Sequence, residues 1–293
     1  MKKKIIFRGV GTALITPMRG GEIDYSALGS LIDMQISSGV DALIIGGTTG
    51  EVATLDDEER YALYRFAAER TNGRTKLIFG VGTNDTKKAI SHAKVARGIG
   101  CDGILAVTPY YNKGTADGIV SHYLALADAT ELPMIVYNVP SRTGVDLSIS
   151  QLSRFLDCER IVAIKEACDS AKKLAELSLF GDELGVYSGS DTEIYTNLAL
   201  GGLGVISVVS NILPREISEL CRKYFSGDTG AALAAQKRYL PFICALFTET
   251  NPAPIKYAMS RLGLSENELR LPMSTVREST ERTLDTEWAR LHP

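Results

Sequence analysis

Lys165 is the residue of this sequence whose side chain most clearly suggests a chemical reaction. It ends the apolar run from Ile161 to Lys165, which is typical of a buried strand. The side-chain period of two puts Lys165 on the same face as Ile161 and Ala163. If that face points inward, desolvation lowers the pKa of the amine, and a neutral amine can attack a carbonyl carbon to form an imine. The pattern leaves a second interpretation open, in which Lys165 pairs with Glu166 or with an acid on the next strand.

Hydroxyl and phenol groups follow other apolar runs and are candidates for proton transfer. A tyrosine can act as an acid or a base when neighbouring hydroxyls relay the proton. The candidates are Tyr137, Tyr111 and Thr48. For the two tyrosines, aromatic packing at the rim of the fold is the alternative interpretation.

The segment from Gly46 to Glu51 reads Gly-Gly-Thr-Thr-Gly-Glu. Its N–H groups and hydroxyls could hold a carboxylate or a phosphate, although, taken alone, a glycine-rich turn between a strand and a helix explains it better. It lacks the spacing of a nucleotide loop, and no G-x-G-x-x-G motif of a dehydrogenase follows the first strand. The histidines lie on predicted helices or at the end of the sequence, so we expect neither a metal centre nor a Ser-His-Asp triad. They are His92, His122 and His292.

These candidates must be positioned by a repeating pattern of strands and helices. Eight short apolar runs alternate with segments of helical periodicity, which predicts parallel strands covered by helices. Eight such units predict an α/β fold of the (β/α)8 TIM barrel type, with the functional groups at the carboxyl ends of the strands. The predicted strands are Gly9–Ile15, Ala42–Gly47, Lys76–Gly82, Gly103–Thr108, Met134–Asn138, Ile161–Lys165, Gly185–Gly189 and Gly204–Val209.

The helices follow from capping residues and apolar spacing. We expect helices over 24–38 and 84–100, and another that begins near Thr54, which can cap it. A helix starts at Pro214, and the sequence beyond it contains no further strand. The predicted division is therefore a barrel domain over residues 1–227 and a C-terminal helical domain over 228–293.

Composition narrows the class of partner. The 293 residues carry 32 Lys plus Arg against 35 Asp plus Glu, which gives a formal charge of −3 and no positive field for nucleic acid or an anionic membrane. The 5 cysteines form no C-x-x-C pair, which indicates a reducing compartment. The basic start lacks the apolar stretch of about 7–15 residues that a secretion signal needs. We therefore expect a cytoplasmic protein that binds small molecules.

Several motifs together resemble the pyruvate-dependent lysine aldolase family. They are Gly47-Thr48-Thr49-Gly50-Glu51, Thr108-Pro109-Tyr110-Tyr111-Asn112, Tyr137-Asn138-Val139-Pro140-Ser141-Arg142-Thr143-Gly144, Ile164-Lys165-Glu166-Ala167 and Gly204-Val205-Ile206-Ser207. The resemblance covers nearly the whole chain. It implies a condensation of pyruvate with L-aspartate 4-semialdehyde at the start of diaminopimelate and lysine biosynthesis, with no metal or organic cofactor.

The same resemblance implies a role for each residue of the site. Lys165 would form the imine with pyruvate, while Tyr137, Thr48 and Tyr111 would form a proton relay. Tyr111 would reach in from a neighbouring subunit of a homotetramer built as a dimer of dimers. The remaining four would bind substrates: Thr49 the pyruvate carboxylate, Arg142 the carboxylate of the semialdehyde, and Gly189 and Ile206 through backbone groups.

Two alternatives and one regulatory expectation follow. Relatives such as N-acetylneuraminate lyase share the lysine and tyrosine but lack an arginine at the position of Arg142, and a non-catalytic binding protein could share the fold. Lysine-inhibited members carry histidines and a glutamate where this chain has Asp57, Arg60 and Lys88. A cation where the ammonium of an effector should bind is repulsive, so we expect inhibition by lysine to be weak or absent.

Overall fold

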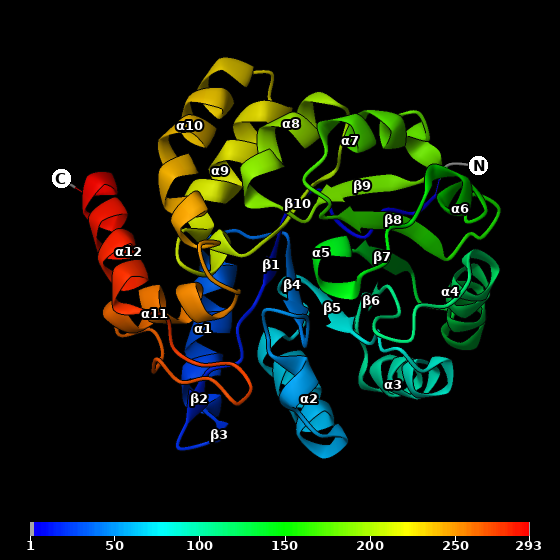
Figure 1. The fold of residues 1–293 in the computed structure, drawn as a ribbon, viewed down its shortest axis with the longest axis horizontal. Coiled ribbons are helices and arrows are strands. Elements are labelled where there is room, and N and C mark those ends of the chain that lie inside the picture. The colour runs from blue at the N-terminus through cyan, green and yellow to red at the C-terminus, as the bar shows by residue number, and fades with distance from the viewer. Residues whose placement is uncertain (1–2, 293) are drawn as a thin grey trace.

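Eight parallel strands close into a barrel in the computed structural model, which describes residues 3–292. Strand β1 pairs with both β4 and β10, which completes the ring (Figure 1). The prediction of a (β/α)8 barrel is therefore confirmed. Most strands end one or two residues earlier than predicted, because the last residues of the predicted runs already belong to the loops. The strands are β1 (Gly9–Ala13), β4 (Ala42–Ile45), β5 (Lys76–Gly80), β6 (Gly103–Val107), β7 (Met134–Asn138), β8 (Ile161–Glu166), β9 (Gly185–Ser188) and β10 (Gly204–Ser207).

Each barrel strand buries both faces, in two separate apolar clusters. Leu43 and Ile45 of β4 belong to the cluster that includes the surrounding helices. Ala42 and Ile44 belong to a smaller inner cluster that lacks residues of the outer helices. On β8, Ala163 lies in the inner cluster, so the side-chain period of two puts Lys165 on the inner face. Ile161, predicted on that same face, lies in the outer cluster instead, because the register of β7 and β8 shifts between Met134 and Ile135. The predicted inward direction of Lys165 is confirmed.

The outer layer consists of one or more helices after each strand. They are α1 (Tyr25–Ser37), α2 (Asp57–Thr71), α3 (Thr86–Ile99), α4 (Ala116–Thr130), α5 (Pro140–Thr143), α6 (Ile149–Ser153), α7 (Ala171–Ser178), α8 (Ile194–Ala199) and α9 (Pro214–Phe225). A short hairpin of β2 (Met18–Arg19) and β3 (Glu22–Ile23) was not predicted. Two-residue strands are too short to show a period of two in the sequence.

The predicted cap of the second helix at Thr54 is wrong. Helix α2 is capped by Asp56, which accepts from the backbone N–H of Glu59 while the Glu59 side chain accepts from the backbone of Asp56. Thr54 instead ends the 3-10 turn η1 (Val52–Thr54). Glu51, with φ 52°, turns the chain before η1, and the helix starts at Asp57, at the end of the stretch from Thr54 to Asp57 in which a start was predicted.

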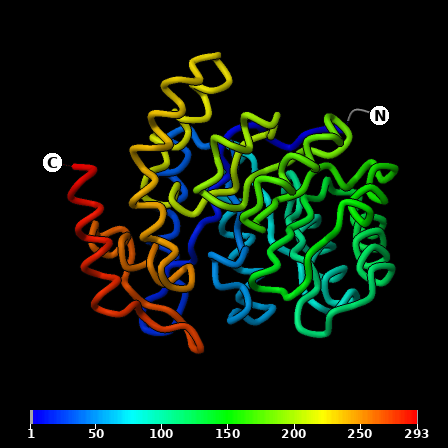
Figure 2. Tube along the Cα trace, turned by 45° about the horizontal axis from the view of Figure 1, so that its top comes forward, coloured from blue at the N-terminus to red at the C-terminus, as the bar shows by residue number. Residues whose placement is uncertain are grey.

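The C-terminal segment forms three helices along one side of the barrel: α10 (Thr229–Ala245), α11 (Ala253–Arg261) and α12 (Glu278–Leu291). Figures 1 and 2 both show this segment, coloured from yellow through orange to red, grouped at one side, with α10 beside α9. None of the helices within residues 3–292 has the length and apolar character needed to cross a membrane. The division after residue 227 stays a prediction.

Candidate active site

A cavity of about 350 Å³ opens at the carboxyl ends of the barrel strands. Its walls come from the loops after several different strands and from the loop between α10 and α11. Six of the eight residues that the sequence singled out line it: Thr48, Thr49, Tyr137, Arg142, Lys165 and Gly189. Residues that are up to 141 positions apart in the chain (48 to 189) therefore meet in one place.

Lys165 is buried at the floor of this cavity, with 5% of its surface exposed. Burial is the main cause that lowers the pKa of its amine to about 7. The carboxylate of Asp191 acts in the opposite direction and Arg142 adds to the lowering. A substantial fraction of the amine is therefore neutral near neutral pH, which is the form that attacks a carbonyl.

The interpretation of Lys165 as the partner of Glu166 is wrong. Glu166 lies on the outer face of β8, where Asn138 donates to it at 2.9 Å and the Lys173 amine lies 3.6 Å away. Among residues 3–292, no ion pair within 4 Å involves Lys165. Its amine lies instead 4.2 Å from the ring centroid of Tyr137.

Tyr137 is set beside Lys165 by the register of β7 and β8, which pairs these two residues. Burial raises the pKa of the Tyr137 phenol, although Arg142 and a hydrogen bond with Thr48 act against the rise. The phenol is therefore protonated near neutral pH and can pass a proton between Thr48 and a group bound at Lys165. This contact brings two of the predicted relay residues together.

Asp191 is a buried carboxylate at the same mouth, with 1% of its surface exposed. Its Oδ2 accepts from the backbone N–H groups of Val208 and Val209, each at 2.9 Å. Burial raises the pKa of this carboxyl, while these hydrogen bonds and Lys165 lower it. Asp191 thus ties the loop after β9 to the loop after β10 and adds negative potential near the amine.

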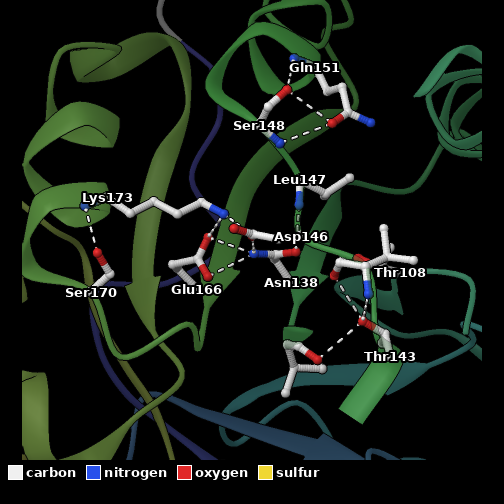
Figure 3. A network of polar contacts seen from close by, with 12 residues as sticks. Thr108, Asn138, Thr143, Asp146, Leu147, Ser148, Gln151, Glu166, Ser170 and Lys173 are labelled. Carbon is white, nitrogen blue, oxygen red and sulfur yellow. Dashed lines mark hydrogen bonds and ion pairs between the residues drawn. The ribbon is translucent and has the colours of Figure 1, made fainter. Parts of the chain in front are cut away.

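A polar network lies on the outer face of β7 and β8 (Figure 3). The register places Asn138 opposite Glu166, one position on from Tyr137 and Lys165. Asn138 Nδ2 donates to Asp146 at 2.8 Å and its Oδ1 accepts from the Leu147 N–H at 3.1 Å. Lys173 forms ion pairs with Asp146 and Glu166. The network holds the loop of residues 139–147, which carries Arg142.

Glycine at position 189 is explained by close packing against the reactive lysine. A Cβ at Gly189 would lie 2.7 Å from the Cβ of Ala167, 3.0 Å from the Glu166 oxygen and 3.1 Å from Lys165 Cε. Any larger residue would therefore displace the backbone or the side chain of Lys165.

Comparisons with known proteins agree with this geometry. A sequence model described as "Dihydrodipicolinate synthetase family" matches residues 6–289. The 4-hydroxy-tetrahydrodipicolinate synthase of Alkaliphilus oremlandii is 44% identical over 280 residues, which are 95% of this chain and 97% of that protein. The chain belongs to the dihydrodipicolinate synthetase family.

Solved structures of the family superpose on nearly the whole chain. The 4-hydroxy-tetrahydrodipicolinate synthase of Methylacidiphilum fumariolicum SolV has a TM-score of 0.96 at 39% identity, over 98% of this chain and 96% of that chain. A dihydrodipicolinate synthase of Acinetobacter baumannii, described as complexed with pyruvate, has a TM-score of 0.94 at 36% identity. It covers 97% of this chain and 99% of that chain.

Two predicted residues of the family site do not line the cavity. Tyr111 is 89% exposed and adopts a positive φ of 69°, on the loop after β6. Ile206 is fully buried in the inner cluster, and Val208 reaches the cavity two positions further along. Of the three predicted relay residues, only Tyr137 and Thr48 therefore line the cavity within one chain of this family member.

Sequence reasoning missed Asn251, which lines the cavity of this family member from the C-terminal segment. Its Nδ2 donates to Thr49 Oγ1 at 2.9 Å across 202 positions of sequence. No motif or periodicity marks a polar residue in a loop between two helices, so no signal in the sequence could have found it.

Proposed function

We propose that this chain is a 4-hydroxy-tetrahydrodipicolinate synthase. It condenses pyruvate with L-aspartate 4-semialdehyde, in the first committed step of diaminopimelate and lysine biosynthesis. The observation that carries the proposal is the buried Lys165 amine, whose pKa is lowered to about 7, beside Tyr137 at the mouth of the barrel. A binding protein would have no use for such an amine.

The reaction starts on Lys165. The neutral amine attacks the keto carbon of pyruvate, water leaves, and an imine forms. The imine withdraws electrons from the methyl group, so that one methyl proton can leave and an enamine results. The enamine carbon attacks the aldehyde carbon of the second substrate, whose oxygen takes up a proton. The amine of that substrate then closes the ring on the imine carbon and releases Lys165.

This scheme needs no metal and no organic cofactor, because the imine itself supplies the electron sink. Proton transfers fall to Tyr137 and Thr48, which are hydrogen-bonded to each other beside the amine. A protonated phenol can donate to the hydroxyl that leaves as water and can accept a proton again through Thr48.

The substrate carboxylates bind at separate points in this proposal. Thr49 receives the carboxylate of pyruvate, and Gly189 and Ile206 contribute to the site through backbone groups. Arg142 receives the carboxylate of the semialdehyde, which its guanidinium can bind with two parallel hydrogen bonds.

We propose that Tyr111 completes the relay from a neighbouring subunit within a homotetramer, a dimer of dimers. Its 89% exposure in the single chain supports an intermolecular role, because an isolated phenol on the surface relays nothing to the cavity of its own chain. The substrates are central metabolites, so we place the reaction in the cytoplasm.

Turnover with the two substrates tests the function. Pyruvate plus aspartate 4-semialdehyde should give a cyclic product, while N-acetylneuraminate should give no pyruvate. Release of pyruvate from N-acetylneuraminate, with no product from the semialdehyde, would instead make the chain a sialic acid lyase. Arg142 in the cavity favours the first result, since a short carboxylated aldehyde can reach it.

A further inference from the structure

Asn251 connects the C-terminal segment to both of the proposed carboxylate-binding side chains. It lies in the loop between α10 and α11 and is 5% exposed. Its Nδ2 donates to Thr49 Oγ1, and its main-chain oxygen accepts from Arg142 Nη2, each at 2.9 Å. One residue therefore orients a hydroxyl and a guanidinium at the same cavity.

The contact with Thr49 sets the direction in which that hydroxyl can act. A threonine hydroxyl has one proton to donate and two lone pairs to accept with. Because Thr49 Oγ1 accepts the amide proton of Asn251, its own proton stays available to a group in the cavity. A carboxylate is an acceptor only, so this orientation suits a carboxylate.

The opposite orientation of the amide is disfavoured. Asn251 Oδ1 is buried and has no hydrogen-bond partner among residues 3–292. If the amide were reversed, a buried NH₂ group with two donors would take that unpartnered position. Buried donors without partners are rarer than under-satisfied carbonyl oxygens, so the orientation with Nδ2 toward Thr49 holds.

A second contact fixes the same loop from the same segment. Glu51, two positions after Thr49, forms an ion pair with Lys256 of α11, and both side chains are almost fully buried. Glu51 Oε2 also accepts from the main-chain N–H of Arg270 at 3.2 Å, and Lys256 Nζ donates to the main-chain oxygen of Glu268 at 2.8 Å. The loop that carries Thr49 therefore has little freedom to turn its hydroxyl away from Asn251.

We propose that Asn251 is a positioning residue that holds the Thr49 hydroxyl as a hydrogen-bond donor to the carboxylate of pyruvate. The inference rests on the proposed function, because it requires that Thr49 binds that carboxylate. It gives the C-terminal segment a part in the selection of the first substrate, since the donor direction of Thr49 is set from outside the barrel.

Steady-state kinetics of three variants test this. Asn251→Leu removes the amide at similar size without adding charge, and Asn251→Asp reverses the hydrogen bond, since a carboxylate can only accept from Thr49. Thr250→Ala is the matched control, because Thr250 is the exposed neighbour in the same loop. We expect Asn251→Leu to raise the KM for pyruvate about tenfold and Asn251→Asp to raise it further, because a hydrogen bond to a charged group is lost. The value of kcat and the KM for the semialdehyde should stay within about threefold, and the control should match the unmodified protein.

A double variant separates positioning from general damage. In a Thr49→Val background, Asn251→Leu should change the pyruvate KM less than about twofold, because the two residues act through one hydroxyl. If Asn251→Leu still raised the pyruvate KM about tenfold in that background, the inference would be overturned. It would also be overturned if Asn251→Leu alone lowered kcat and raised both KM values by similar factors. If Asn251→Leu does not fold, the pyruvate KM of Asn251→Asp is compared with and without Thr49→Val in the same way.

The failure of this inference can be told from the failure of the proposed function. Borohydride reduction with increasing pyruvate gives the concentration at which half of the protein is trapped as an adduct. If the unmodified protein traps no pyruvate, the proposed function fails. If it does trap pyruvate but both Asn251 variants require the same pyruvate concentration as the control, only the role of Asn251 fails.

Discussion

Two buried lysines, Lys165 at the mouth of the barrel and Lys256 where α11 meets the barrel, have opposite surroundings. Lys256 is fully buried, forms an ion pair with Glu51 and donates to a backbone oxygen at 2.8 Å. Lys165 is nearly as buried, yet it forms no ion pair within 4 Å among residues 3–292, and its amine lies 4.2 Å from the centroid of the Tyr137 ring. Both pKa values are lowered by burial, but only at Lys256 does a carboxylate in direct contact oppose the shift.

The difference shows that burial alone does not make a lysine structural or reactive. A buried ammonium with a paired carboxylate stays charged and joins two segments. A buried amine without such a partner is readily neutral and keeps its lone pair for chemistry. The two lysines can therefore be distinguished by what each substitution removes: chemistry at Lys165 and stability at Lys256.

The largest effect should come from Lys165→Ala. Because the variant has no amine to form the imine, we expect turnover to fall on the order of 10⁴-fold or more, with little change in the melting temperature. The assay is condensation of pyruvate with aspartate 4-semialdehyde. Lys172→Ala is the control, since the Lys172 side chain is 85% exposed and does not line the cavity. A variant that kept a tenth of the activity would contradict the assignment.

Lys256→Met should act on stability. It leaves Glu51 buried without its partner, so we expect the free energy of unfolding to fall by about 3–5 kcal/mol. Urea and thermal midpoints measure this, and Glu51→Gln combined with Lys256→Met should recover part of the loss. Lys172→Met, which removes only an exposed pair with Glu176, should cost at most about 1 kcal/mol. Equal losses for the two methionine variants would remove the contrast between the two environments.

Arg142→Leu should separate the two substrates. We expect kcat/KM for the semialdehyde to fall about 10–100-fold, because a charge-assisted bidentate contact is lost. Trapping of pyruvate on Lys165 should change much less when measured well above pH 7, where the amine is neutral in either protein. Arg142→Lys should lie between the two, since an ammonium makes no bidentate contact. An equal loss for pyruvate trapping would place Arg142 on the first substrate instead.

The pH dependence reports the environment of the Lys165 amine. The amine reacts when neutral, so kcat/KM for pyruvate should rise with pH through about 7 and then level off. Asp191 raises the pKa of Lys165, so Asp191→Asn should lower that pKa and move the acid limb to lower pH. Asp169→Asn, at another residue of the cavity wall, should leave the limb in place. If the acid limb of the pH profile moved to higher pH in Asp191→Asn, the electrostatic account would be contradicted.

The smallest effect concerns L-lysine. Asp57, Arg60 and Lys88 meet around His92 in the structure: Arg60 lies 2.7 Å and Asp57 3.1 Å from the imidazole, and Lys88 lies 3.7 Å from Asp57. The two cations disfavour an additional ammonium. We expect millimolar L-lysine to change turnover little, and a submillimolar inhibition constant would refute this.

The barrel was predictable because each of its strands corresponds to a short apolar run in the sequence. The period of two grouped Lys165 with Ala163, and both lie on the inner face of β8. The same period wrongly grouped Ile161 with them, because the register of β7 and β8 shifts between Met134 and Ile135 and Ile161 lies in the outer cluster. Caps were less certain: Thr54 is a good cap by type, but the left-handed turn at Glu51 moves the start of α2 to Asp57. That turn depends on contacts with Lys256 and Arg270, which are far away in sequence.

The candidate site was predictable where a functional side chain lies at the end of a strand or just after it. Thr48, Tyr137 and Lys165 each follow directly from a strand and its register. Asn251 and the ionic contacts of Lys256 were not predictable, because their partners lie about 200 residues away and no period links them. Ile206 does not line the cavity, whereas Val208, two positions further along, does.

The most direct test of the account is to map where pyruvate attaches. The protein is incubated with pyruvate, reduced with borohydride, digested and analysed by mass spectrometry. The account predicts one reduced pyruvate adduct per chain, on the peptide that contains Lys165, and none on the peptides that contain Lys173 or Lys256. An adduct on another lysine, or no adduct while turnover continues, would contradict it.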